Sequence, residues 1–480
     1  MVTRPGTPLL NGTTVNGRDP GPSLALAYAR RPDVREGRVR MLRQLVTLPT
    51  VSSSAAHRGA VDRAAELLRR ELDRIGMDRS LILRGTGPPS VWGEWRRAPG
   101  RPVLLLYGHF DVQPPGSSAG WSRPPFSGVI SGGRIHGRGS SDNKGPLLAQ
   151  LAALENYLAT SGWLPVNVRV WLEAEEEAGS PHLGRLLDRY GHLIRADGLA
   201  VSDSTRLAGG DRPTLVTGLR GLVDLRLRVA GPGHALHSGQ LGGEVRDPAL
   251  VLTQMVASLW DSRGRIAVPG FYRQVRPPAP GERARLTSGR PSPESLAEAA
   301  SVRAEELLGE CGWEPGERST LRPSLTVTGL SAGSTGAGAT NAITTSATAR
   351  INIRLVPDQR PADVVALVTR HLHAVVPPRT KYRLDVLASA DPVLVPDDHP
   401  LVRAAGRALR ATWRKPPAYL RSGGTIPVVA ELHRRFGMPA ALWGLSRPGD
   451  HIHSSDESFA LEDLHRGSEV ATRFLHELAP

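Results

Sequence analysis

The feature that most constrains the fold is a change in strand pattern along the chain. Short continuous apolar runs, typical of strands buried on both faces of a parallel sheet, occur at 103–107, 166–172, 198–201 and 440–445. Between the third and fourth runs, residues 223–229 and 343–355 alternate apolar and polar side chains, as in a sheet with one wet face. The sequence therefore predicts an α/β domain with a mainly parallel sheet, interrupted by an inserted α+β domain.

Length, helical spacing and loop composition predict the domain boundaries. At 480 residues, the chain is too long for a single core. Apolar spacing predicts helices over 61–75, 144–162, 401–412 and 461–478. A stretch rich in Pro, Gly and Arg predicts loops over about 262–295. The predicted divisions are a flexible leader over 1–35, a catalytic segment over 36–212, the inserted domain over 213–396 and a second catalytic segment over 397–480.

The net charge of +14 could indicate a nucleic-acid-binding protein. Lysine occurs only at positions 144, 381 and 415, so almost all of the basic charge is arginine, and it is scattered along the chain. A nucleic-acid-binding surface needs its basic residues on one face or stripe. We therefore predict no nucleic-acid partner.

The apolar runs are far shorter than the ~20 residues of a membrane-spanning helix. Residues 1–19 lack the apolar core of a secretory signal. The single cysteine, Cys311, cannot form an internal disulfide, so the fold does not depend on an oxidising compartment. These features predict a cytoplasmic protein with no membrane partner.

Histidines and carboxylates follow the predicted buried strands. They are His109 and Asp111 after the first run, Glu176 and Glu177 after the second, Asp203 after the third, and His451 and His453 after the last, with Asp142 just before a helix. Each alone has an ordinary explanation, such as a helix N-cap or a solvated face. Because ligands of parallel sheets bind beyond the carboxyl ends of the strands, their joint occurrence there favours a functional site.

Histidine and carboxylate without thiolate form the ligand set of Zn²⁺, Mn²⁺ or Co²⁺ in hydrolytic sites. Asp142, Glu177 and Asp203 together with one hydroxide carry four negative charges, which two divalent ions neutralise. A single ion would leave like charges crowded in a desolvated cleft. The sequence therefore predicts two divalent ions per chain, with Zn²⁺ as the first choice.

Five ordered motifs occur at 106–114, 137–145, 175–180, 202–203 and 453–457, with shorter matches at 218–221, 236–239, 354–357 and 423–427. Together they resemble the M20 family of metallopeptidases, and within it the carnosine-dipeptidase branch, over about residues 40–475. The resemblance implies a di-metal exopeptidase-like catalytic domain with an inserted lid and dimerisation domain, and a homodimer as the working assembly.

The resemblance also implies the ligand set of each metal. His109, Asp142 and Asp203 would hold one ion. Asp142, as a bridge, would hold the other together with Glu177 and His453. His451 is a competing ligand, but only His453 has the matching spacing to the acidic pair at 456–457.

Catalytic and substrate-binding roles follow from the same resemblance. Asp111 would orient His109 and raise its basicity, and Glu176 would be the general base. His237 would reach the site of a neighbouring subunit and stabilise the oxyanion. The residues implied to bind the substrate's terminal carboxylate are Arg354, Asn341, Gly424 and Thr425.

Two departures from the family pattern concern substrate preference. Thr344 replaces a usual proline, and the segment 387–393 lacks a histidine that many relatives use to contact the substrate. The acids of the metal site are intact, so the predicted chemistry is unaffected.

The predicted function is hydrolysis of the amide bond of dipeptides or small N-acyl amino acids, through a metal-bridging water and a glutamate base. The alternatives are an aminoacylase or deacylase, a tailoring amidohydrolase of secondary metabolism, and acyl transfer to an amine in place of water. A non-catalytic binding protein is a further alternative. Glu176 argues against it, because a structural metal site needs no adjacent free carboxylate.

Overall fold

The computed structural model describes residues 21–479 except 208–211, 288–291 and 338. Its strands are β1 (Arg79–Leu83), β2 (Ser90–Trp95), β3 (Val103–His109), β4 (Val129–Ser131), β5 (Arg134–His136), β6 (Asn167–Glu173), β7 (Gly198–Val201), β8 (Thr214–Leu219), β9 (Gly221–Ala230), β10 (Leu236–His237), β11 (Ser324–Ala332), β12 (Ala342–Ile343), β13 (Ser346–Leu355), β14 (Tyr382–Ala390), β15 (Val393–Leu394), β16 (Ala418–Ser422), β17 (Ala440–Trp443) and β18 (Ser458–Ala460).

The helices occupy both the large domain and the insertion. They are α1 (Pro22–Ala29), α2 (Pro32–Val46), α3 (Arg58–Ile75), α4 (Gly145–Ser161), α5 (Leu183–Ile194), α6 (Ser238–Leu241), α7 (Pro248–Ala257), α8 (Pro280–Thr287), α9 (Pro293–Ala300), α10 (Glu317–Leu321), α11 (Pro361–Val375), α12 (Pro400–Trp413), α13 (Pro427–Phe436) and α14 (Leu461–Glu477).

The large sheet has the strand order β1-β2-β6-β3-β7-β17-β8-β15, with β16 paired to β8. Its central strands β6, β3, β7 and β17 run parallel. The flanking strands β1, β2, β8 and β15 pair antiparallel with their neighbours along this order. This confirms the predicted α/β domain with a mainly parallel sheet.

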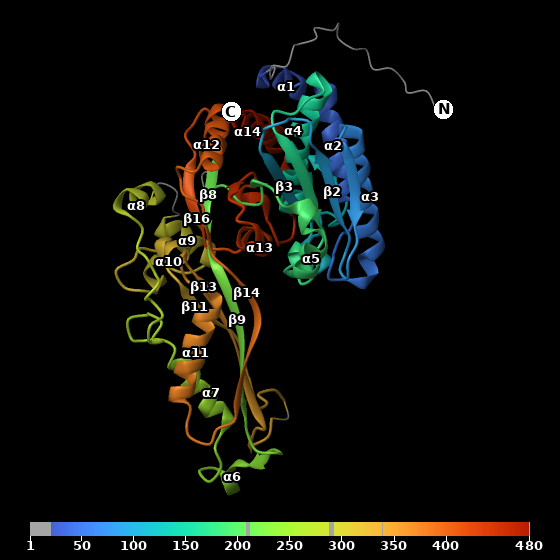
Figure 1. The fold of residues 1–480 in the computed structure, drawn as a ribbon. Helices are drawn as coiled ribbons and strands as arrows, with labels where there is room; N and C mark the ends of the chain where they lie inside the picture. Colours follow the sequence, from blue (N-terminus) through green and yellow to red (C-terminus); the bar gives the residue numbers. More distant parts are fainter. Residues whose placement is uncertain (1–20, 208–211, 288–291, 338, 480) are drawn as a thin grey trace.

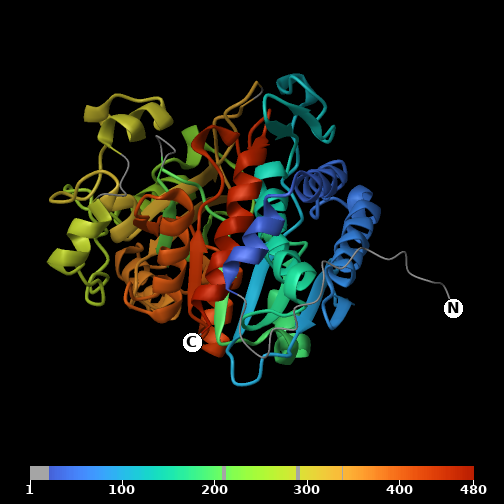
Figure 2. The ribbon, with the colours of Figure 1, turned by 90° about the horizontal axis from the view of Figure 1, so that it is seen from above.

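Helices cover the large sheet and bring distant segments together. Helix α3 packs on β1 and β2, and Gly76 caps its C-terminus in a left-handed conformation (φ 101°) that suits glycine. Helix α4 packs on β3 and also against α14. Figure 2 shows α14, in red, beside the first helix, in blue, so the first and last helices lie side by side.

The inserted domain is built on a separate antiparallel sheet with the order β11-β13-β9-β14. Helices α7 and α11 pack on this sheet, and the alternating apolar residues of β9 and β13 are buried against them in a second core. Figure 1 shows this domain extending away from the large sheet, with α6 at its far end. The predicted insertion of an α+β domain is therefore confirmed.

Three details differ from the sequence-based expectations. Residues 22–35 form α1 and the start of α2, and Ala25, Leu26 and Ala29 are buried, so the predicted flexible leader is wrong for this stretch. The remainder of that prediction, at 1–20, lies outside the described residues. The expected loops over 262–295 include α8 and the start of α9.

The predicted boundary at 212/213 is also displaced. Strand β8 lies wholly buried in the large sheet, so the inserted domain begins at β9, and the chain returns to the large sheet at β15. None of the helices in the described part of the chain combines the length and apolar character that crossing a membrane requires.

Candidate metal centre

Strand β3 carries His109 to the carboxyl edge of the large sheet. The imidazole is fully buried, and its Nδ1–H donates to the backbone oxygen of Asp111 at 3.2 Å and lies 3.4 Å from Asp111 Oδ1. The backbone oxygen of Asp111 can only accept a hydrogen bond, so Nδ1 keeps its proton, and in the neutral ring Nε2 is the nitrogen without one. The lone pair of Nε2 is then available to a metal ion.

Asp142 lies in the tight turn that precedes α4, and a buried carboxylate shapes this turn. Glu457 accepts hydrogen bonds from the backbone N–H groups of Gly139, Ser141 and Asp142 at 3.0, 3.0 and 3.1 Å. It also accepts one from Arg138 Nη1 at 2.7 Å. Burial raises the pKa of Glu457 to about 7, although Arg138 opposes this shift. A single side chain therefore fixes the loop that carries Asp142.

The turn after β6 carries Glu176 and Glu177, and the carboxylate of Asp111 binds the backbone of this turn. Asp111 Oδ1 accepts the N–H of Glu176 at 3.2 Å, and Oδ2 accepts the N–H of Glu177 at 3.1 Å. Ser52 Oγ donates to the same Oδ2 at 2.8 Å. Asp111 thus contacts His109 as the sequence predicts, and it also fixes the position of both glutamates, which the sequence did not predict.

Asp203 follows the end of β7. Its Oδ1 accepts a hydrogen bond from Asn143 Nδ2 at 2.9 Å, and its Oδ2 lies 3.6 Å from His109 Nε2. Glu177, in the turn after β6, has a similar contact: its Oε2 accepts a hydrogen bond from Gln113 Nε2 at 2.9 Å. For Asp203, the amide contact holds one oxygen and leaves the other directed toward the cluster, whereas in Glu177 the oxygen that accepts from Gln113 is also the one that faces His453.

Two groups of ligand-type atoms share Asp142. In each group, His109–Asp142–Asp203 and Asp142–Glu177–His453, the ligand atoms lie within 4.8 Å of one another. Asp142 Oδ1 is 3.1 Å from His109 Nε2, Asp142 Oδ2 is 3.1 Å from His453 Nε2, and the same nitrogen of His453 is 3.2 Å from Glu177 Oε2. Because each oxygen of Asp142 faces a different group, this carboxylate has the geometry of a bridge. His451 belongs to neither group.

The charges of the cluster fit divalent cations. Burial, followed by the charge of Asp142, raises the pKa of Asp203 to about 7. Hydrogen bonds to Asp142 and Glu177 raise the pKa of His453 to about 10. For His109, burial disfavours the charge, but contacts with Asp111 and Asp142 outweigh it and raise the pKa. Without cations, bound protons must balance the negative charge of these buried carboxylates. Cations bound to the same atoms would displace those protons.

A cavity of about 350 Å³ lies between Asp203 of this cluster and the loop that follows β16. Gly424 and Thr425 are among the residues that line it. Arg354 Nη1 donates to Thr425 Oγ1 at 2.9 Å. Three of the four predicted carboxylate-binding residues therefore come together beside the cavity.

Asn341 and His237 lie elsewhere. The backbone oxygen of Asn341 accepts hydrogen bonds from the N–H and the hydroxyl of Ser238, the residue next to His237. His237 is exposed, and its Nδ1 accepts the N–H of Gly239 at 3.1 Å. Helix α6, which His237 caps, lies at the end of the inserted domain farthest from the large sheet (Figure 1). Within one chain, these two residues are therefore not part of the metal cluster.

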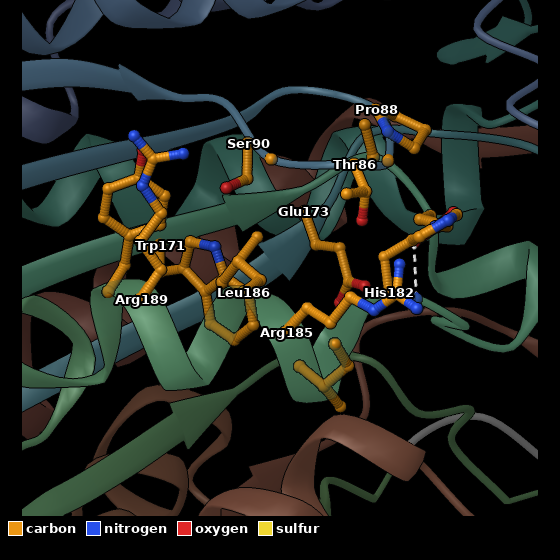
Figure 3. A pocket seen from close by; sticks show the side chains of 15 residues that line it. Thr86, Pro88, Ser90, Trp171, Glu173, His182, Arg185, Leu186 and Arg189 are labelled. Atoms are coloured by element: carbon orange, nitrogen blue, oxygen red, sulfur yellow. Dashed lines mark hydrogen bonds and ion pairs between the residues drawn. The ribbon is translucent and has the colours of Figure 1, made fainter.

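A second cavity, of about 250 Å³, lies between β6 and α5. The candidate metal ligands do not line it. Figure 3 shows Glu173 and His182 on its wall, with Arg185 and Arg189 nearby. The Glu173 carboxyl accepts a hydrogen bond from Tyr107 Oη at 2.8 Å, and burial raises its pKa to about 7. No ligand of either predicted metal lines this cavity.

Sequence reasoning assigned no role to Glu457, Asn143 or Gln113. All three lie inside the motifs that carried the family resemblance, next to or near a predicted ligand. Their position inside these motifs was the one sequence feature that could have marked them as functional. Their partners, however, are set by loop geometry that the sequence pattern does not reveal.

Residues 105–477 match the peptidase family M20/M25/M40. The chain belongs to this family. It is 29% identical over 465 residues to the Cys-Gly metallodipeptidase dug1 of Schizosaccharomyces pombe, covering 92% of this chain and 95% of that protein. It is 30% identical over 397 residues to the Beta-Ala-His dipeptidase of Rattus norvegicus, covering 82% and 80%.

Among solved structures, an M20 family metallo-carboxypeptidase from Sulfolobus solfataricus aligns with a TM-score of 0.81 and 26% identity, over 92% of this chain and 99% of that one. These comparisons confirm the predicted family, its carnosine-dipeptidase branch and the fold of a catalytic domain with an inserted domain. The chain is a metallopeptidase with a site for divalent metal.

Proposed function

We propose that this metallopeptidase hydrolyses dipeptides or small N-acyl amino acids that carry a free carboxylate, using two divalent ions. The observation that carries the proposal is the placement of Asp142, with one oxygen in each ligand group and Glu176 next to Glu177 at the same turn. The dipeptidase names of the aligned relatives support the substrate class. Zn²⁺ is our first choice of metal, with Mn²⁺ or Co²⁺ as alternatives.

When bound, two such cations supply the Lewis-acid chemistry that activates water and polarises a carbonyl. His109, Asp142 and Asp203 would hold one ion, and Asp142, Glu177 and His453 the other. All of these residues except His453 are positioned by a neighbour described above: His109 by Asp111, Asp142 by Glu457, Asp203 by Asn143, and Glu177 by Asp111 and Gln113.

Glu176 is the proposed general base. Burial raises the pKa of its carboxyl well above the ordinary value, with a further contribution from Asp203, although the charge of His109 acts in the opposite direction. Its backbone N–H donates to Asp111, which fixes the turn, and its carboxyl lies close enough to the cluster to interact with the charges of His109 and Asp203. In the proposed reaction it takes a proton from the attacking water and delivers that proton to the leaving amine, a role typically contributing about 10²–10⁴ in rate.

Arg354 is the proposed partner of the substrate's carboxylate, because a guanidinium binds a carboxylate through two parallel hydrogen bonds. The hydroxyl of Thr425 donates to the backbone oxygen of Arg220 at 2.5 Å and accepts from Arg354. Thr425 therefore orients Arg354, and Gly424 lines the adjoining cavity.

His237 is proposed to act across a homodimer, together with the neighbouring Asn341. Both lie at the far end of the inserted domain, which a second copy can bring to the cluster of its partner.

We place the activity in the cytoplasm, since the exposed Cys311 needs no oxidising compartment.

Hydrolysis of a dipeptide library by the metal-loaded enzyme, with and without chelator, tests the proposal. We expect release of free amino acids that stops on chelation, and much weaker hydrolysis of the corresponding dipeptide amides. Activity confined to N-acyl amino acids would indicate an aminoacylase or tailoring amidohydrolase, and products joined to an added amine would indicate acyl transfer. Activity that chelators leave unchanged would refute the proposal.

Mixing two inactive variants tests the role of His237. In a mixed dimer of His237→Ala and Glu176→Gln, one site keeps its own Glu176 and receives the partner's intact His237. Random exchange should therefore restore about a quarter of the wild-type activity. If His237 acted within its own chain, the mixture would remain inactive.

A further inference from the structure

Arg220 connects the two domains at the junction between β8 and β9. It is only 9% exposed. Its Nε donates to the backbone oxygen of Gly423 at 2.9 Å, and its backbone N–H donates to the oxygens of Ser422 and Gly424 at 3.3 and 3.2 Å. Its own backbone oxygen accepts the hydroxyl of Thr425 at 2.5 Å. One residue therefore contacts all four residues of the 422–425 loop.

The same guanidinium reaches the inserted domain. Arg220 Nη1 donates to the backbone oxygen of Arg322 at 3.3 Å and to Ser324 Oγ at 3.1 Å, at the start of β11. The loop itself packs tightly here, because a Cβ atom built on Gly423 would lie 2.5 Å from the backbone oxygen of Ser319. Arg220 thus ties the loop to the segment that follows α10.

The charge of Arg220 has no carboxylate among these hydrogen-bond partners. Burial, followed by the positive charge of Arg354, lowers its pKa to about 10. Burying a guanidinium against neutral oxygens, here two backbone carbonyls and one hydroxyl, is costly, so apolar packing would serve a purely structural role better. Two guanidinium groups, Arg220 and Arg354, therefore contact the loop that lines the cavity and lie close enough for their charges to interact.

We propose that Arg220 is a positioning residue for carboxylate recognition: it fixes the 422–425 loop and, through Thr425, the orientation of Arg354, and it places a permanent positive charge behind the substrate's carboxylate. This inference rests on the proposed function, in which Arg354 binds that carboxylate.

The test compares Arg220→Lys with the wild type on a dipeptide and on the same dipeptide blocked as its amide. Lysine keeps the charge but cannot reproduce the planar fork that reaches Gly423, Arg322 and Ser324 at once. We expect KM for the free dipeptide to rise about 10- to 100-fold with kcat nearly unchanged, because the lost interactions bind substrate and transition state alike. Hydrolysis of the amide should hardly change. Arg434→Lys, an exposed arginine of α13 paired with Glu431, is the matched control and should behave as wild type.

Several results would overturn the inference. An Arg220→Lys variant with unchanged KM and unchanged preference for the free carboxylate would refute it. An equal loss of activity on both substrates, accompanied by release of metal, would also refute it, because that result indicates structural damage only. If Arg220→Lys does not fold, Gly423→Ala displaces the same loop against Ser319 and must raise KM in the same way. A wild type that accepts the amide as readily as the acid would refute carboxylate recognition itself, and this inference with it.

Discussion

Replacing Asp111 by asparagine tests how the buried carboxylate organises the metal centre. In the wild type its two oxygens accept hydrogen bonds from the backbone of Glu176, the backbone of Glu177 and the hydroxyl of Ser52, while one of them also faces His109 Nδ1. An asparagine side chain has one acceptor oxygen and one NH₂ donor. In either orientation of the amide, the NH₂ group therefore meets at least one N–H donor.

The expected magnitude follows from this count. At least one hydrogen bond to an ionised acceptor is lost, about 1.5–3 kcal/mol, and a buried N–H is left without a partner. The imidazole of His109 also loses its anionic neighbour, which lowers its basicity toward a metal. Together these effects should weaken metal binding and kcat/KM by about 10- to 100-fold.

The assay is titration of the metal-loaded enzyme with a competing chelator, followed by kcat/KM in excess metal. Ser52→Ala is the control, because it removes one donor to the same oxygen at a half-buried position that water can reach. It should change either quantity less than about threefold. Metal affinity in Asp111→Asn equal to that of Ser52→Ala would refute the reasoning.

Three further predictions concern the same cluster. Glu176→Gln should keep two metals per chain and reduce kcat by about 10²–10⁴-fold, and metal loss in this variant would mean that Glu176 is a ligand. Glu457→Ala leaves Arg138 buried without its partner, so we expect about 3–5 kcal/mol lower unfolding free energy and loss of metal, measured by denaturant titration and metal analysis. In the metal-free protein, burial raises the pKa values of Asp203 and Glu457 to about 7, above their unfolded values, so the folded state holds more protons up to that pH. Its Tm should therefore fall from pH 5 to pH 7, and a flat or rising Tm over this range would contradict this.

The convergence of the candidate ligand residues could be predicted because they follow strands that proved to be parallel. The ends of β3, β6, β7 and β17 lie at one edge of the sheet, so residues that follow them in the sequence converge in space. The shared role of Asp142 came from the family resemblance, and the structure places its two oxygens accordingly.

Other features depended on contacts that no local pattern encodes. The backbone N–H groups held by Glu457 lie more than 300 residues earlier in the chain, at separations of 315–318. Strand β8 contains threonine and glycine, so its burial on both faces left no continuous apolar run. Helix α1 has eight residues and is stabilised by packing on α4 and α14, because a helix this short is marginal on its own.

Anomalous diffraction from crystals of the metal-loaded enzyme tests the central claim most directly. The account predicts two ions per chain, one among His109, Asp142 and Asp203 and the other among Asp142, Glu177 and His453, with a different oxygen of Asp142 on each. A single ion, or an Asp142 carboxylate that gives both oxygens to one ion, would contradict it.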